Sequence, residues 1–318
     1  MLTDVVFILI GMGGLFIGGE ALIRSSSRLA TGLGIPAIVV GLTVVALGTS
    51  TPELVVSLSA AAGGSTELAL GSIVGSNIAN IGLILGLAGL IRPLRVHASL
   101  IRREIPLMVA ISILVFLVAL DGSISRIEGL ILFGGYLVFT WFLYRGAAKG
   151  ARENREVQDE VAALEGQPAR IRRAREVALV LISIAILIAG AQFTVTGASS
   201  VARALGISEL VIGLTLVAVG TSLPEVATSI IATLRGHEDL ATSNAVGSNI
   251  ANLLVILGVT AMILPVPVAD RVLRVELPVM LAFAIVIMLL SFRQQLPRWV
   301  GGLLLAAYLT FVILTFAG

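Results

Sequence analysis

The chain has 318 residues, of which 57% are hydrophobic and 13% charged, and its mean hydropathy is +1.06. These values lie outside the range of soluble globular domains, so most of the chain is predicted to sit in a lipid bilayer. The absence of cysteine excludes disulfides and thiolate metal sites, and two histidines are too few for a zinc or copper cage. The net charge is +2, and its basic residues fit membrane topology better than nucleic-acid binding.

A helix needs roughly 20 apolar residues to cross the hydrocarbon layer, and ten stretches are predicted to do so. The first is interpreted as a retained helix rather than a signal peptide, because nothing basic precedes Val5 and no cleavage site follows. The ten stretches begin near Val5, Ala37, Leu68, Glu104, Ile127, Val177, Leu210, Leu240, Val275 and Trp299. They end near Leu22, Ala62, Leu90, Leu120, Tyr144, Val201, Leu234, Leu264, Phe292 and Phe316.

Arg and Lys residues predict the orientation. With the N-terminus outside, most of them fall in inner loops, as the positive-inside rule requires. The hydrophilic stretch 147–176, interrupted by Gly166-Gln167-Pro168, then becomes a cytoplasmic linker with a short helix or disorder. Both termini become extracytoplasmic in this multi-pass protein of the cell membrane. The basic residues left outside are Arg126, Arg203, Arg271 and Arg274.

An internal repeat appears when the sequence is shifted by 172 residues. The segments 41–86 and 213–258 then align without a gap, and 25 of the 46 positions are identical. Each half, 1–146 and 177–318, holds five predicted helices, and an odd number of crossings turns the second copy upside down. The predicted fold is therefore an all-α membrane protein of ten helices in two inverted repeats, an arrangement typical of secondary transporters.

The best-matched motifs place an acid inside an apolar helix twice. Gly48–Glu53 reads GTSTPE and Gly220–Glu225 reads GTSLPE. An unpaired charge at that depth costs at least ~2.5 kcal/mol, and no Lys or Arg of the same segments can offset it. The missing counter-charge is most simply a bound cation, although a protonated glutamate hydrogen-bonded between helices is the alternative.

Prolines and hydroxyls beside these acids supply further oxygen ligands. Pro52 and Pro224 remove a helical hydrogen bond and loosen the preceding turns, which begin at Ala46 and Ala218. Backbone carbonyls at membrane depth are tolerated where they line a cavity. Hard cations such as Na+ and Ca2+ prefer oxygen ligands, which carbonyls and hydroxyls provide. The hydroxyl groups come from Thr49, Ser50, Thr221 and Ser222.

A second pair of motifs, Gly75–Asn80 and Gly247–Asn252, reads GSNIAN in both copies. Ser76 and Asn80 are four residues apart, as are Ser248 and Asn252, so each pair shares a helix face and offers neutral oxygens to the same site. The intervening Asn77 and Asn249 are interpreted as helix-to-helix hydrogen bonders.

Together, the paired motifs resemble the alpha repeats of the cation/calcium exchanger superfamily, and most of all its prokaryotic sodium/calcium exchangers. The resemblance covers the whole chain except the central linker, and it implies exchange of three Na+ for one Ca2+ by alternating access. It also implies cation sites with carbonyl assistance from Ala46 and Ala218. The implied side-chain ligands are Thr49, Ser50, Glu53, Ser76, Asn80, Thr221, Ser222, Glu225 and Ser248.

Two features bear on the coupling ion. Some members of the superfamily carry aspartate where this chain has Asn252, which bears on stoichiometry and any K+ requirement. Proton/calcium antiporters usually carry a GNxxE-like motif, so the threonine-serine version favours Na+ coupling. A proton/calcium antiporter stays the main alternative, and a cation channel is a less favoured one. The only predicted partners are lipid and the transported ions Na+ and Ca2+; neither a protein partner nor a cofactor can be inferred.

Enzymatic functions are not predicted. A primary pump would need a phosphate-binding loop and a soluble nucleotide domain, which the sequence lacks. A hydrolase inside the membrane would need a nucleophile with an activating base, and no serine has one in a recognisable setting.

Overall fold

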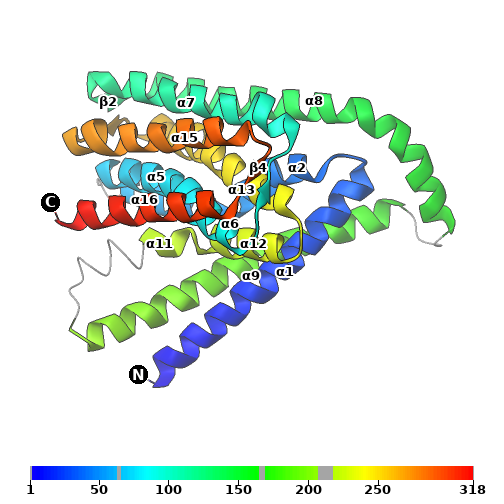
Figure 1. The fold of residues 1–318 in the computed structure, drawn as a ribbon, viewed down its shortest axis with the longest axis horizontal. Helices are drawn as coiled ribbons and strands as arrows, with labels where there is room; N and C mark the ends of the chain where they lie inside the picture. The colour runs from blue at the N-terminus through cyan, green and yellow to red at the C-terminus, as the bar shows by residue number, and fades with distance from the viewer. Residues whose placement is uncertain (1, 63–65, 165–168, 207–217, 318) are drawn as a thin grey trace.

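A computed structural model describes residues 2–62, 66–164, 169–206 and 218–317, and this part of the chain is mostly helical (Figure 1). The elements of the first half are α1 (Leu2–Leu33), α2 (Ala37–Val40), η1 (Gly41–Val45), α3 (Ala46–Thr49), α4 (Thr51–Ala62), α5 (Thr66–Ala79), η2 (Asn80–Leu85), α6 (Gly86–Ile91), β1 (Leu94–Arg95), η3 (Leu100–Glu104), α7 (Ile105–Val118), η4 (Ala119–Asp121), β2 (Ser123–Ile124) and α8 (Arg126–Leu164). Those of the second are α9 (Ala169–Ala204), α11 (Ala218–Thr221), α12 (Leu223–Leu234), α13 (Glu238–Ala251), η6 (Asn252–Ile256), α14 (Leu257–Ile263), β3 (Val266–Pro267), η7 (Val272–Glu276), α15 (Leu277–Ser291), β4 (Gln295–Leu296) and α16 (Arg298–Ala317).

Eight of the described helices are long and apolar enough to cross a membrane, and the bent pair Ala37–Thr49 and Thr51–Ala62 makes up to nine. Eight of the ten predicted stretches correspond to the first group and the second stretch to the bent pair. The remaining prediction, Leu210–Leu234, falls partly on residues 207–217, which lie outside the described residues; its described part is α11 and the apolar α12. Ten spans therefore stay a prediction.

The helix α1 is longer than predicted, because it continues to Leu33 instead of ending near Leu22. Arg24 and Arg28 are thus helical rather than in a loop, and both remain solvent- or headgroup-exposed. A long arginine stem lets the charge reach the interface from inside a helix, so the charges do not end it. The end comes at Gly34, whose φ of 68° suits glycine, and at Pro36 two residues later.

The predicted linker is also more helical than expected. Instead of a short separate helix or disorder, α8 runs on for 39 residues to Leu164, and α9 begins at Ala169. Residues 151–164 contain neither glycine nor proline and are rich in Ala, Arg and Glu, which are strong helix formers. The predicted break at Gly166-Gln167-Pro168 lies outside the described residues.

The helices α1 and α9 lie against each other along much of their length and run obliquely to the other helices (Figure 1). Small residues bring their backbones close. A Cβ added to Gly190 would stand 2.8 Å from the backbone nitrogen of Leu15 and 2.9 Å from the carbonyl oxygen of Gly11. Because lipid supplies no hydrophobic drive between helices, such close backbone packing is what holds membrane helices together.

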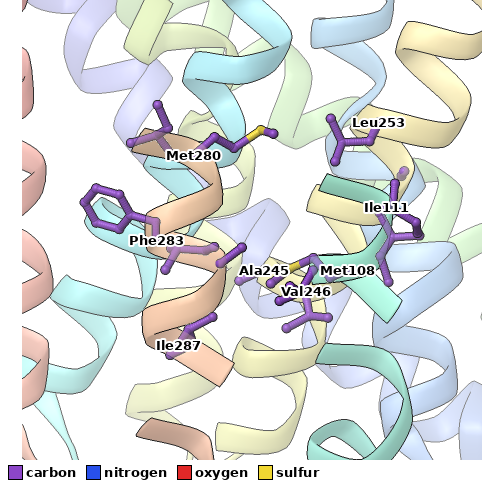
Figure 2. Close-up of a cluster of buried hydrophobic side chains, with 14 of the residues drawn as sticks. Met108, Ile111, Ala245, Val246, Leu253, Met280, Phe283 and Ile287 are labelled. Atoms are coloured by element: carbon purple, nitrogen blue, oxygen red, sulfur yellow. The ribbon is translucent and has the colours of Figure 1, made fainter. Parts of the chain in front are cut away.

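The main hydrophobic core is built from elements of both halves, among them α5, η2, α7, α8, α13, η6, α14, α15 and α16. Figure 2 shows part of it, with Met108 from α7, Val246 from α13, Leu253 from η6, and Met280 and Phe283 from α15. By contrast, α1, α8, α9 and α16 expose many large apolar side chains, as expected for lipid-facing helices.

Structural elements recur at the 172-residue spacing. The π-helical segment η2 corresponds to η6, and η3 corresponds to η7. The strands follow the same rule. Leu94 of β1 pairs with Leu296 of β4, while Ile124 of β2 pairs with Val266 of β3. Each strand of one copy therefore pairs with a strand of the other. A shift of 172 residues turns β1 into β3 and β2 into β4, so the β1–β4 pair is equivalent to the β2–β3 pair.

We expect Gly190→Ala to lower the thermal stability of the purified protein in detergent, because the new methyl group would meet backbone atoms of α1. Overpacking of this kind typically costs 1–3 kcal/mol, although shifts of the two helices can relieve part of it. Gly13→Ala is the control, since a Cβ at Gly13 meets nothing within 4 Å. Equal unfolding temperatures for the two variants would show that the α1–α9 contact is not tight.

Candidate cation-binding site

The prolines break two helices in the same way. Helix α3 ends at Thr49, the following Ser50 has φ −80° and ψ 8°, and α4 begins at Thr51 with a bend of 43° between the two helices. In the second half Ser222 has φ −87° and ψ 4° between α11 and α12. Each break sets a serine at a corner and a glutamate on the first turn of the following helix, as the prolines predicted.

The two breaks face each other across the repeat. The hydroxyl of Ser50 donates to Glu225 Oε1 at 2.9 Å, and the hydroxyl of Ser222 donates to Glu53 Oε1 at 3.0 Å. Ser222 also lies 3.5 Å from the hydroxyl of Ser76. All five side chains are buried. Each glutamate therefore receives a serine hydrogen bond from the other half of the chain, in a place shielded from solvent.

The second oxygen of each carboxyl group has no hydrogen-bond partner. Glu53 Oε2 and Glu225 Oε2 are buried without a hydrogen-bond partner, and neither acid pairs with an Arg or Lys among the residues that the structure describes. Buried oxygens of this kind require a partner. Because their charges also repel each other, the pair is suited to hold a cation.

The threonines complete the reciprocal pattern. The side chain of Thr221 interacts with Glu53, and that of Thr49 interacts with Glu225. The Thr49 hydroxyl also approaches the carbonyl oxygens of Val45 and Ala46, at 3.1 and 3.3 Å. The Ala46 carbonyl additionally accepts the Ser50 N–H at 3.0 Å, so it is less free than the proline alone suggested. Ala218 holds the equivalent backbone position at the start of α11.

Four asparagines cross-link the two GSNIAN motifs. Asn80 Nδ2 donates to Asn249 Oδ1 at 2.9 Å, and Asn252 Nδ2 donates to Asn77 Oδ1 at 3.0 Å. The Oδ1 atoms of Asn80 and Asn252 are buried without a partner. Asn77 and Asn249 thus bond between helices as interpreted from the sequence, and they have a further effect: each fixes the amide of a predicted ligand so that its oxygen stays free.

The structure therefore brings the serines and glutamates of both breaks together, and it buries the Asn pairs on adjoining helices. Ser248 is fully buried with an unpartnered hydroxyl, one helical turn before Asn252. Sequence reasoning missed Met108 and Met280, whose sulfur atoms lie 3.5 Å from Asn249 Nδ2 and 3.6 Å from Asn77 Nδ2. Their spacing of 172 residues was the available signal.

Comparisons with known proteins fit this arrangement. Residues 3–145 and 176–317 match the family model described as sodium/calcium exchanger protein. The chain is 37% identical to the inner membrane protein YrbG of Escherichia coli K12, covering 99% of this chain and 98% of YrbG. It is 31% identical to the sodium/calcium exchanger MaX1 of Methanosarcina acetivorans, covering 99% of each. A solved structure of the sodium-calcium exchanger NCX_Mj, soaked with Na+ and Ca2+, superimposes with a TM-score of 0.85 at 30% identity and 98% coverage of both chains.

Fold and matches together define a multi-pass integral membrane transporter. The chain belongs to the sodium/calcium exchanger family, as the resemblance of its motifs indicated.

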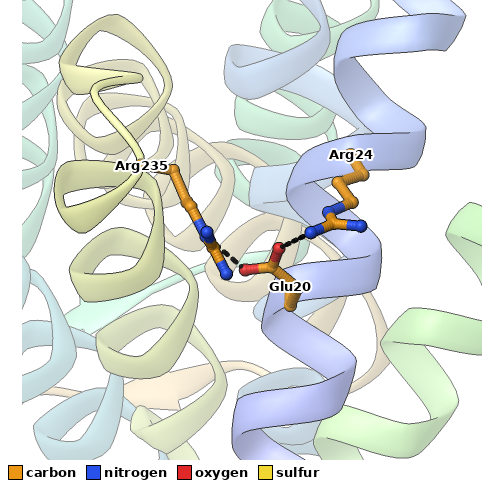
Figure 3. A network of polar contacts seen from close by, with 3 residues as sticks. All are labelled: Glu20, Arg24 and Arg235. Atoms are coloured by element: carbon orange, nitrogen blue, oxygen red, sulfur yellow. Dashed lines mark hydrogen bonds and ion pairs between the residues drawn. The ribbon is translucent and has the colours of Figure 1, made fainter.

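We expect Glu53→Gln and Glu225→Gln to leave thermal stability in ion-free detergent unchanged or to raise it, because each removes a buried charge that lacks a cationic partner. Glu20→Gln is the matched control. Glu20 pairs with Arg235 at 2.8 Å and with Arg24 at 2.6 Å (Figure 3), so its neutralisation should lower stability, by about 1 kcal/mol or less for such solvent-reaching arginines. A large loss of stability in both site variants would indicate that the two carboxylates already have partners.

Proposed function

We propose that this chain exchanges Na+ for Ca2+ across the membrane by alternating access, and that the cluster around Glu53 and Glu225 holds the transported ions. The observation that carries the proposal is the reciprocal Ser50–Glu225 and Ser222–Glu53 pairing, with one carboxyl oxygen of each acid buried and free. Carboxylate, hydroxyl and amide oxygens are the ligands that Ca2+ and Na+ prefer. The relatives MaX1 and NCX_Mj are sodium/calcium exchangers by name, which supports the choice of ions.

The proposed ligand set is the one expected from the sequence. Glu53 and Glu225 supply the negative charge, and the other groups supply neutral oxygens. The neutral ligands are the carbonyls of Ala46 and Ala218 and the side chains of Thr49, Ser50, Ser76, Asn80, Thr221, Ser222, Ser248 and Asn252.

The two halves are proposed to be inverted repeats of five spans, 1–146 and 177–318, joined by the linker 147–176. Reciprocal contacts support this proposal. When residue i of one copy binds residue j of the other and the equivalents of both also bind, the copies are related by an approximate twofold axis. The serine–glutamate bonds, the asparagine bonds and the strand pairs all follow that rule. Five spans per copy place the axis in the membrane plane.

A conformational asymmetry supports alternating access. Helix α1 packs along α12, where a Cβ on Gly19 would touch Ile231, whereas α9 makes no comparable contact with α4 among the described residues. Exposure differs accordingly at equivalent positions: Thr228 on α12 is 1% exposed, while Val56 on α4 is 36% exposed. The repeat is thus closed at α12, which α1 covers, whereas the equivalent position of α4 is left uncovered, and this asymmetry supports a carrier that faces one side.

We propose that the closed end at α12 is cytoplasmic and that both termini are extracytoplasmic. The excess of basic residues on that side supports this orientation. YrbG, by its name, is an inner membrane protein, which supports a location in the cell membrane.

Transport is expected to be electrogenic. With asparagine at positions 80 and 252, the site carries two negative charges from Glu53 and Glu225, so one Ca2+ neutralises it. Three Na+ would leave one excess positive charge, which a low-dielectric site resists. The measurement is Na+-driven Ca2+ uptake into reconstituted vesicles clamped at different potentials with K+ and valinomycin. The uptake rate should change with potential and should nearly vanish in Glu53→Gln and Glu225→Gln.

Three results would contradict this function. A rate that is independent of potential would remove the charge argument, and equal uptake driven by a pH gradient alone would promote the proton/calcium antiporter. Ca2+ flux that needs no ion on the opposite side would instead indicate a channel.

Topology gives an independent test of the inverted repeat, because the chain has no cysteine to interfere. Single cysteines introduced at Gly64 and Gly236 should be labelled by an impermeant reagent from opposite sides of the membrane, with Gly64 outside. Labelling of both from the same side would contradict inversion.

A further inference from the structure

Helices α12 and α13 remain polar one turn beyond the candidate site. They run antiparallel, so Ser229 follows Glu225 by one turn on α12 while Asn244 precedes Ser248 by one turn on α13. Asn244 Nδ2 donates to the hydroxyl oxygen of Ser229 at 3.2 Å. This bond shows that the two polar residues meet one helical turn beyond Glu225 on α12 and one turn beyond Ser248 on α13.

Several oxygens at this level are buried and unused. Asn244 is 0% exposed and Thr228 is 1% exposed, yet Asn244 Oδ1 and Thr228 Oγ1 have no hydrogen-bond partner. The hydroxyl of Ser248, one turn away and 0% exposed, is also unpartnered. Thr228 and Ser229 lie on the same face of α12 as Glu225. Buried polar atoms normally have a hydrogen-bond partner, so three unsatisfied ones on two neighbouring helices call for a ligand.

The first half has only part of this group of oxygens, because Ser57 is fully buried there with an unpartnered hydroxyl. At the equivalent positions it has Val56 for Thr228 and Ser72 for Asn244, and only Ser57 matches Ser229. Val56 is 36% exposed. The Thr228 hydroxyl and the Asn244 amide are therefore found in the second half alone, whereas the serine at position 229 is shared with the first half.

An apolar cluster closes the far side of the polar level. Ile231, Ala232, Leu240 and Ala241 are buried there together with Ile23 of α1. The Glu20–Arg235 ion pair lies beyond it, between α1 and the residue that follows α12 (Figure 3). The unused oxygens are thus enclosed between the candidate site and a sealed end of the protein, where a dehydrated ion would be retained.

We propose that Thr228, Ser229 and Asn244 form a further cation subsite, on the α12–α13 side of the candidate site, that holds one Na+ through neutral oxygens. This inference rests on the proposed Na+/Ca2+ exchange and adds to it a position for which only the second half provides the Thr228 and Asn244 oxygens. Na+ would occupy this subsite between the level of Glu225 and Ser248 and the closed end of the protein.

The chemistry selects a monovalent ion. The subsite has no carboxylate of its own, and its nearest one, Glu225, is a turn away. Stripping water from a divalent cation costs far more than from a monovalent one, so sites for Ca2+ normally use carboxylates. Neutral hydroxyl and amide oxygens can replace part of the hydration shell of Na+.

The test replaces the subsite with the residues of the first half. In the double variant Thr228→Val/Asn244→Ser, purified protein in detergent is titrated with NaCl at constant ionic strength, without Ca2+, and the unfolding temperature is followed. The Na+ concentration for half-maximal stabilisation should rise threefold to tenfold. The corresponding Ca2+ midpoint should stay within twofold of that of the parent protein.

Two further variants keep the test decisive. Thr228→Val alone is nearly isosteric and serves if the double variant does not fold; it should show a smaller shift in the same direction. Thr260→Val is the matched control, because Thr260 in α14 is also fully buried with an unpartnered hydroxyl but lies two turns past Asn252. Its Na+ midpoint should not change.

An unchanged Na+ midpoint in the subsite variants, or an equal weakening of Na+ and Ca2+, would overturn the subsite. A parent protein that neither ion stabilises would overturn the proposed exchange, and this inference with it.

A gain-of-function variant gives a complementary measurement. Asn244→Asp adds a carboxylate, so Ca2+ should then stabilise at lower concentration than in the parent protein, and no change would count against the subsite.

Discussion

Two carboxyl groups lie in the interior of this transporter without a cationic side chain beside them, in the part of the chain that the structure describes. A buried, unpaired charge in a membrane protein is costly, and two neighbouring negative charges are costlier still. The surrounding structure reduces this cost only in part, because one serine of the opposite half donates to each glutamate. Under the proposed function a bound cation offsets the remaining charge, so that ion binding becomes a condition for keeping both acids charged.

The same constraint accounts for the local departures from helical geometry. Proline breaks place Ser50 and Ser222 at corners where their hydroxyls reach across the repeat. The asparagine pairs hold two amide oxygens free beside the site. Among the described residues, the reciprocal contacts between the two halves do not continue around α12 beyond the serines, glutamates and asparagines of the candidate site. One side carries extra polar residues, an apolar cluster and the Glu20–Arg235 ion pair, whereas the equivalent positions of the other half hold Val56, Ser59 and Gln192. A nearly symmetric candidate site therefore lies between two halves whose residues differ beyond it.

Sequence reasoning failed where a charge was read as the end of a helix. Arg24 and Arg28 suggested a loop after Leu22, and the charged stretch after Arg145 suggested only a short helix or disorder within the linker. The described residues of both segments are helical, because arginine and glutamate favour helices and only the glycine and proline near residue 35 interrupt α1. Hydropathy marks where a chain leaves the lipid, whereas backbone chemistry marks where a helix stops, and the two need not coincide.

The sequence by itself determined the membrane class, the repeat, the broken helices and the residue types of the candidate site. Each of these follows from local chemistry: apolar length, identity at a fixed spacing, a missing N–H at proline, and oxygen-bearing side chains on one helix face. Tertiary structure decided which groups meet. Ser50 binds Glu225 across 175 residues and Asn80 binds Asn249 across 169. It also decided that Thr228 is buried while its counterpart Val56 is not. Such pairings depend on how the two halves pack against each other, and no local pattern in either half encodes that packing.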